Sequence, residues 1–149
     1  GWGVAAAVTP VTLLATGCVF FSLVLKPGVW APLCGALGTT PLMLAVLVGA
    51  AQNIASKSTK YALFDPCKEM AYIPLDAEQK TKGKAAVDVI GNPLGKSGGA
   101  LVQQMLILSL GSLAACTPSL ATILFGVIFL WLRAARSLAG QFEAKMASE

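Results

Sequence analysis

Three long stretches without any charged residue constrain the fold of this chain more than any other feature. They cover residues 1–25, 27–56 and 97–132. A helix that crosses the hydrocarbon core of a bilayer needs about 20 predominantly apolar residues. Only 12% of the 149 residues are charged, whereas an average soluble domain has about 25%. The sequence therefore predicts an integral membrane protein.

The charge-free stretches can hold four transmembrane helices, because the third is long enough for two short spans around a turn at residues 111–118. We expect the helices at about residues 3–25, 35–56, 98–113 and 118–132. The predicted fold class is an all-α membrane bundle, with a polar loop at about residues 57–97. The first stretch lacks the basic n-region of a signal peptide. Since the chain opens inside a span, we expect it to be a fragment of a larger protein.

Basic residues gather on one side of the predicted membrane. Seven lysines lie between the second and third spans, and three more basic residues follow the last span. Only Lys26 lies between the first two spans. Loops rich in lysine and arginine face the cytoplasm, so the amino end, the polar segment and the tail are predicted on the inner side. The lysines are interleaved with acids and lack an aromatic platform, so we do not expect nucleic-acid binding.

Metal and cofactor chemistry are not expected in this chain. The sequence has no histidine, and its four cysteines are scattered without a C-x-x-C pair. Zinc and haem sites depend on such ligands at short spacings. We interpret the cysteines as small apolar side chains in or near the helices.

The second predicted span continues into a polar pattern. Asn53, Lys57, Lys60 and Phe64 are separated by four, three and four residues, which places them on one face of a continuing helix. Such a face suits a helix that lines a wet cavity. Alternatively, the helix leaves the membrane and its lysines reach the interface. Both interpretations stay open for Lys57, and the second is favoured for Lys60.

The stretch GNPLGKSGG at residues 91–99 resembles a phosphate-binding P-loop but lacks its spacing. A P-loop has four residues between its first glycine and the Gly-Lys pair, and here Gly91 and Gly95 enclose three. A helix that begins near Leu94 would instead place Lys96 and Gln103 on one face. An anion there would meet a lysine and the positive end of a helix. The alternative is a glycine-rich helix start whose lysine reaches the membrane surface.

Three motifs occur in order over a short distance: KYALFDPCKEMAYIPLD (residues 60–76), KGKAAVD (82–88) and GNPLGKSGGALVQQ (91–104). Together they closely resemble the C-terminal part of the ATP/ADP translocases of plastids and obligate intracellular bacteria, and more the plastid branch. The resemblance implies a transporter of about twelve helices similar to the major-facilitator fold, of which this chain is the last third. The N-terminal two-thirds would supply the other wall of the substrate cavity.

The implied activity is exchange of cytosolic ATP for ADP and phosphate across the plastid inner envelope, or across the inner membrane of an intracellular bacterium. No enzymatic step is expected. We assign phosphate neutralisation to Lys96 and polar contacts to phosphate, ribose or base to Gln103 and Asn53. Lys57 is a further candidate for nucleotide or phosphate binding and can also join Lys68 and Lys84 in an electrostatic entrance. Gate salt bridges are assigned to Asp65, Glu69 and Asp88.

Two other functions are alternatives. A membrane-embedded enzyme or lipid-binding subunit would need a nucleophile with its base, or metal ligands, within the spans, and the sequence offers neither. A transporter of the same family with proton coupling or broader nucleotide specificity would need a proton carrier, for which Asp88 is the one acid near a span. The sequence leaves exchange and symport open.

Overall fold

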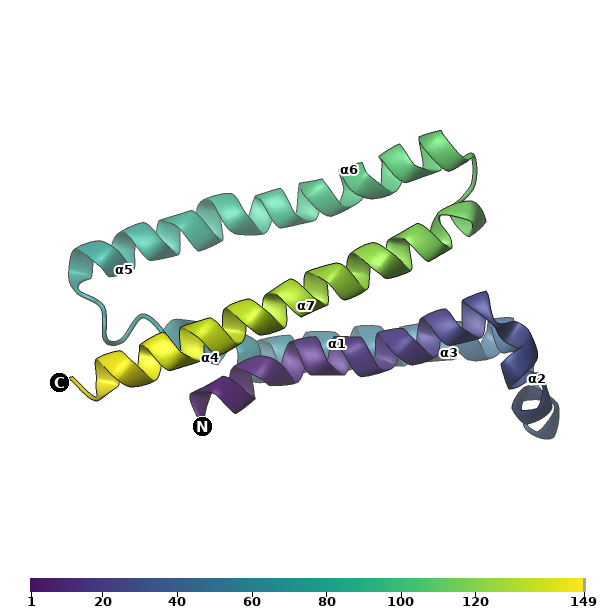
Figure 1. The fold of residues 1–149 in the computed structure, drawn as a ribbon, viewed down its shortest axis with the longest axis horizontal. Helices are drawn as coiled ribbons and strands as arrows, with labels where there is room; N and C mark the ends of the chain where they lie inside the picture. Colours follow the sequence, from purple (N-terminus) through teal and green to yellow (C-terminus); the bar gives the residue numbers. More distant parts are fainter. Residues whose placement is uncertain (149) are drawn as a thin grey trace.

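The computed structural model describes residues 1–148, and most of them are helical (Figure 1). Two of the helical segments, η1 (Lys60–Phe64) and η2 (Ala85–Gly91), are π-helices. In chain order the elements are α1 (Trp2–Leu25), α2 (Pro27–Ala36), α3 (Pro41–Thr59), η1 (Lys60–Phe64), α4 (Asp65–Met70), α5 (Ala77–Lys84), η2 (Ala85–Gly91), α6 (Asn92–Leu110) and α7 (Leu113–Met146). The described part of the chain contains no strand, so the all-α class is confirmed.

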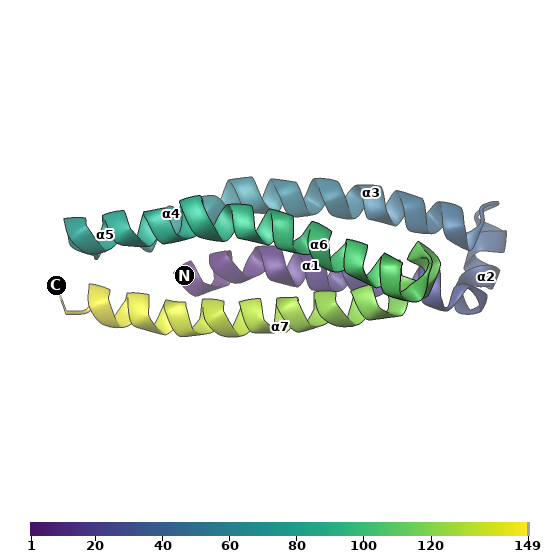
Figure 2. The same ribbon diagram turned by 90° about the horizontal axis from the view of Figure 1, so that it is seen from above.

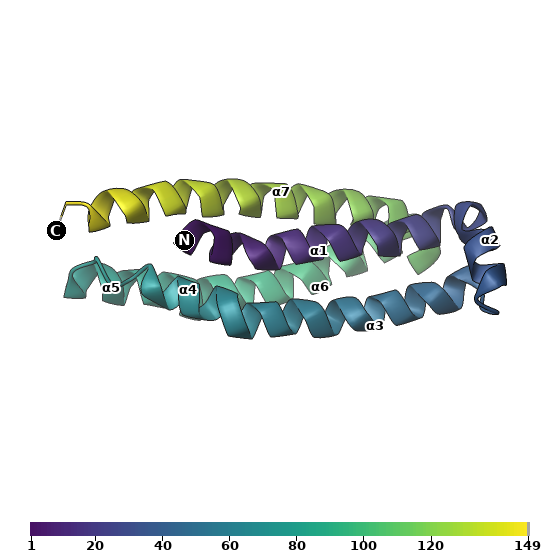
Figure 3. The same ribbon diagram turned by 90° about the horizontal axis from the view of Figure 1, so that it is seen from below.

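The long helices run roughly parallel to one another, with α1 between α3 and α7 (Figures 2 and 3). Helix α6 contacts α7, to which a short turn joins it, and has no buried residue of its own. The turn uses Gly111 with a φ of 83°, a left-handed conformation that glycine adopts without a steric penalty. One long helix of the chain is thus largely uncovered by the others.

Two helices, α1 and α7, are long and apolar enough to cross a membrane. The pair formed by α2 and the helix that runs from Pro41 to Met70 meets the same criteria together, with a bend of 91° between its parts. Helix α6 does not meet them, and it carries Asn92, Lys96 and Gln103 among its apolar residues. The count of four spans therefore stays a prediction.

Two helix starts differ from those expected. The second long helix begins at Pro41, after Thr40, whose hydroxyl accepts a hydrogen bond from the backbone N–H of Met43 at 3.2 Å. The last helix begins at Leu113 and continues through Pro118 to Met146, so the turn expected over residues 111–118 is wrong beyond Ser112. Ser112 accepts a hydrogen bond from the N–H of Ala115, and such caps satisfy the free donors of a helix start.

The polar segment at 57–97 is mostly helical, and its prediction as a loop is wrong. Helix α3 continues through η1 and α4 to Met70, and after a turn at residues 71–76 the chain returns through α5 and η2 directly into α6. We call residues 60–91 the polar hairpin. A proline is the second residue after the end of each π-helix, Pro66 after η1 and Pro93 after η2. Proline lacks an N–H for the carbonyl four residues earlier, which accounts for the local widening of the helix.

Small and aromatic residues set the packing of α1 against its neighbours. A Cβ atom on Gly3 would lie 2.9 Å from the Cβ of Ala139, so α1 and α7 approach backbone to backbone there. The Trp2 ring stacks on Phe142 with centroids 5.3 Å apart, and the Phe64 ring meets Trp131 edge-on at 5.1 Å. These contacts fix the end of the bundle from which the polar hairpin extends.

Candidate functional site

Polar side chains follow one another along α3 and into the first residue of η1, and we call this line the α3 polar stripe. Its members lie one or three to four residues apart: Gln52, Asn53, Ser56, Lys57 and Lys60. Next to α1 the first three of them line a hollow of about 230 Å³, together with Leu13 and Gly49. Asn53 and Lys57 are exposed. Uncharged groups therefore occupy one part of the stripe, and lysines begin one helical turn further along.

A second line of polar residues follows the return arm of the polar hairpin into α6, and we call it the α6 polar stripe. Its members are spaced by four residues: Lys84, Asp88, Asn92 and Lys96. The side-chain amide of Asn92 lies 3.4 Å from Asp88 Oδ1. Lys96 is exposed and has no carboxylate within 4 Å among residues 1–148. Gln103 lies about two turns further along α6 and is also exposed.

Two ion pairs join the arms of the polar hairpin. Lys68 Nζ lies 3.0 Å from Asp88 Oδ1, and Lys84 pairs with Glu69. The hydrogen bond to the Asp88 carboxylate raises the pKa of Lys68, and partial burial opposes this only in part. Lys68 therefore keeps its positive charge at neutral pH. A third pair, Lys60 with Asp65 at 2.8 Å, lies within one arm.

The structure sorts the predicted site residues into paired and unpaired groups. Lys68 and Lys84, assigned to an electrostatic entrance, are both neutralised by an acid. Lys57 and Lys96 have no such partner in the described part of the chain. The three acids assigned to a gate all take part in ion pairs. Their gating role, like the nucleotide contacts of the lysines, stays a prediction.

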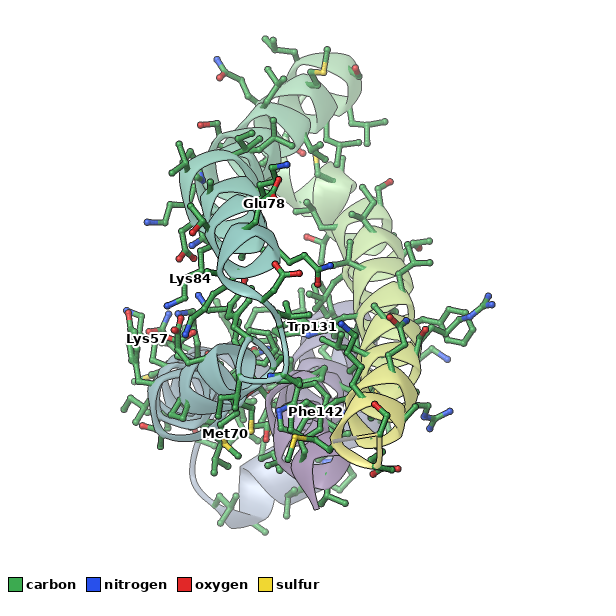
Figure 4. The ribbon with its side chains drawn as sticks, turned by 90° about the vertical axis from the view of Figure 1, so that its left-hand side faces the viewer. Lys57, Met70, Glu78, Lys84, Trp131 and Phe142 are labelled. Atoms are coloured by element: carbon green, nitrogen blue, oxygen red, sulfur yellow. The ribbon has the colours of Figure 1, made fainter. Side chains whose placement is uncertain are left out.

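Lys57 of α3 and Lys84 of the return arm project on the same side of the molecule. Figure 4 shows Lys57 and Lys84 on the side away from α7, whereas Trp131 points into the bundle. Each of the two polar stripes thus contributes one lysine to this side.

Sequence reasoning missed an apolar cavity of about 390 Å³ at the same end of the bundle. Trp2, Phe64, Tyr72 and Trp131 are among its lining residues. Trp2 Nε1 donates a hydrogen bond to the backbone carbonyl of Cys67 at 2.8 Å. This contact joins residues 65 positions apart, so no local pattern could have predicted it. Residues of α1, of the polar hairpin and of α7 line the cavity, so it lies where these three parts meet.

The described chain is helical, with helices long and apolar enough to cross a membrane and with polar stripes that run along α3 and α6. Residues 1–142 match the model of the TLC ATP/ADP transporter family, and the chain belongs to that family. No solved structure matches the chain.

The curated relatives are plant and bacterial carriers. The chain is 64% identical over its whole length to the ADP,ATP carrier protein 2, chloroplastic, of Arabidopsis thaliana, of which it covers 24%. It is 58% identical over its whole length to the ADP,ATP carrier protein 1 of Chlamydia trachomatis, of which it covers 28%. Over 95% of its length it is 43% identical to the carrier of the same name in Rickettsia prowazekii, of which it covers 29%. The chain thus spans about a quarter of these relatives.

Proposed function

We propose that the chain is the C-terminal part of a transporter that exchanges ATP for ADP, with phosphate as a further substrate. The observation that carries this proposal is its membership of the TLC ATP/ADP transporter family, with relatives that are named ADP,ATP carriers. Higher identity to the plant relatives than to the bacterial ones favours the plastid inner envelope as its membrane. The inner membrane of an intracellular bacterium is the alternative.

In this proposal the chain contributes four spans of a twelve-helix, major-facilitator-like transporter. α1 and α7 supply two of them, the bent pair α2 and α3 a third, and α6 the fourth. The polar hairpin and the tail lie on the inner side, since they hold most of the basic residues, and with four spans the amino end lies on the same side as the tail. The uncovered surface of α6 suits a helix that faces the N-terminal two-thirds of the transporter.

Lys96 is the residue to which we assign phosphate neutralisation. It lies in the first turns of α6, and its ammonium is free of carboxylates among residues 1–148. Nothing lies within 4 Å of the Cβ positions of Gly95 and Gly99, so a ligand can approach the backbone closely. Lysine suits an exchanger because its ammonium is a mobile point charge that does not bind phosphate in a bidentate way. The nucleotide can therefore both bind and dissociate.

The remaining polar residues take supporting roles. Lys57 and Gln103 extend the phosphate path from Lys96 along the two polar stripes, and Asn53 contacts ribose or base. The pairs Lys68–Asp88 and Glu69–Lys84 hold the polar hairpin closed in one state of an alternating-access cycle. No covalent step is required, because substrate gradients drive the exchange.

Uptake of labelled ATP by the full-length parent in intact expressing cells tests this proposal, with and without internal ADP. We expect internal ADP to stimulate uptake and Lys96→Gln to abolish the stimulation. The matched control is Lys80→Gln, which removes an exposed lysine of α5 that has no ion pair in the described chain. Uptake that ignores internal ADP would contradict exchange and favour proton coupling. Normal exchange by Lys96→Gln, at wild-type abundance in the membrane, would remove its role at phosphate.

A further inference from the structure

The hollow between α1 and α3 is a small site with an uncharged polar lining. Its lining residues are Leu13, Gly49, Gln52, Asn53 and Ser56, and its volume is about 230 Å³. Pockets for whole drug-sized ligands span about 300–1,000 Å³, so this hollow suits one ring system. Its polar residues stand out against two helices that are otherwise mostly apolar.

Two glycines bring other parts of the bundle close to this hollow. A Cβ on Gly49 would lie 3.3 Å from the Phe20 ring, so the absence of that Cβ lets α1 and α3 approach closely. Gln52 Nε2 lies 3.9 Å from the Cβ position of Gly17 on α1. Gln52 is therefore half-buried between the two helices, whereas its neighbour Asn53 is exposed. The packing holds the Gln52 carboxamide at the edge of the hollow before any ligand arrives.

The side chains of Gln52 and Asn53 make no hydrogen bond within residues 1–148. Each carboxamide offers one acceptor oxygen and two N–H donors. A half-buried polar group without a partner loses free energy relative to water. A neutral ligand with adjacent donors and acceptors would satisfy it, whereas a phosphate offers acceptors only.

The charges lie beyond the hollow on the same helix. Lys57 follows Asn53 by four residues, which is about 6 Å along a helix axis, and it has no carboxylate partner among the described residues. A ligand with a neutral ring in the hollow and phosphates toward Lys57 matches this order of groups. That is the layout of a nucleotide.

We propose that this hollow holds the nucleobase of the transported nucleotide, and that Gln52 selects adenine by a bidentate contact to its N6 and N7 atoms. The inference rests on the proposed nucleotide transport and adds a base site to it. A carboxamide accepts from the N6 amine and donates to N7. Guanine presents acceptors at both O6 and N7, so no orientation of the Gln52 amide can satisfy that edge.

The test is competition binding with the purified full-length parent in detergent, using labelled ATP and three unlabelled competitors: ATP, GTP and 7-deaza-ATP, which lacks the N7 acceptor. We expect wild type to bind ATP at least about tenfold more tightly than GTP, a ratio typical of one lost bidentate contact. Against 7-deaza-ATP, which loses only one of the two hydrogen bonds, we expect about three- to tenfold. In Gln52→Leu, ATP should weaken to the level of GTP, whose own affinity stays within about twofold.

Leucine has approximately the size of glutamine, so Gln52→Leu should fold with the same packing beside Gly17. Gln52→Asn is a second variant, which keeps the amide group but has a side chain one methylene shorter. The matched control is Gln104→Leu, the same change at an exposed position of α6. If Gln52→Leu keeps the wild-type ratio of ATP to 7-deaza-ATP, or if wild type does not distinguish them, the proposal is wrong. Binding with the expected ratios but without ADP-stimulated uptake would overturn the proposed exchange alone.

Discussion

The ion pair between Lys68 and Asp88 offers a direct test of the proposed gate. It joins two arms of the polar hairpin that are 20 residues apart in sequence, with 3.0 Å between Nζ and Oδ1. Lys68→Glu places two acids at this contact and Asp88→Lys two lysines. The double swap carries both substitutions and restores a pair of opposite charges, with the acid and the lysine on exchanged arms. If the pair holds the hairpin closed, each single change should slow exchange and the double swap should recover it.

The size of the effect follows from the separation and exposure of the two groups. Two unit charges 3.0 Å apart attract by about 1.4 kcal/mol in a medium with the dielectric constant of water. The side chains of Lys68 and Asp88 are 24% and 42% exposed, so solvent and salt reduce this to the range of exposed pairs, about 0.2–1 kcal/mol. Replacing attraction by repulsion should therefore cost about 1 kcal/mol, or about a fivefold shift in the closed population.

The assay is ADP-stimulated ATP uptake by the full-length parent, corrected for the amount of protein in the membrane. We expect about a fivefold slower exchange for each single variant, and recovery to within about twofold for the double swap. Raising the salt concentration should shrink the differences. Lys80→Glu controls for net charge, since Lys80 has no ion pair in the described residues. A double swap as slow as the single variants would refute the reasoning.

Two further changes probe the packing that positions the site, both measured as the melting temperature of the purified full-length protein. Gly3→Ala should destabilise by about 1–3 kcal/mol, as overpacking does, because its Cβ would lie 2.9 Å from that of Ala139. Gly126→Ala is the control, because a Cβ at Gly126 would have no atom within 4 Å, and it should be neutral or stabilise by up to about 1 kcal/mol. Equal effects of the two substitutions would refute the close approach of α1 and α7. Thr9→Val should stabilise by about 1 kcal/mol, because Thr9 Oγ1 is buried without a hydrogen-bond partner in the described chain and such a group is costly. A lower melting temperature for Thr9→Val would mean that the hydroxyl has a partner.

The candidate site was accessible to sequence reasoning where it depends on helical spacing. The positions of Asn53 and Lys57 on one face follow from their separation by four residues, and the same holds for Asn92 and Lys96. The partners of the charged residues did not follow. Lys84 pairs with Glu69 across 15 residues, and the sequence offered several other acids at comparable distances.

The sequence by itself determined that the chain is helical and apolar enough for a membrane. The reason is local: a backbone in hydrocarbon must satisfy its own hydrogen bonds, and a charge-free stretch of sufficient length does so as a helix. Only the tertiary structure decided that the polar segment folds into a helical hairpin, which lysines keep an unpaired charge, and that Gln52 lines a hollow beside α1. These features depend on which helices pack together and on how far each is shifted along its axis relative to its neighbour. Such contacts join residues far apart in the chain, as between Trp2 and Cys67.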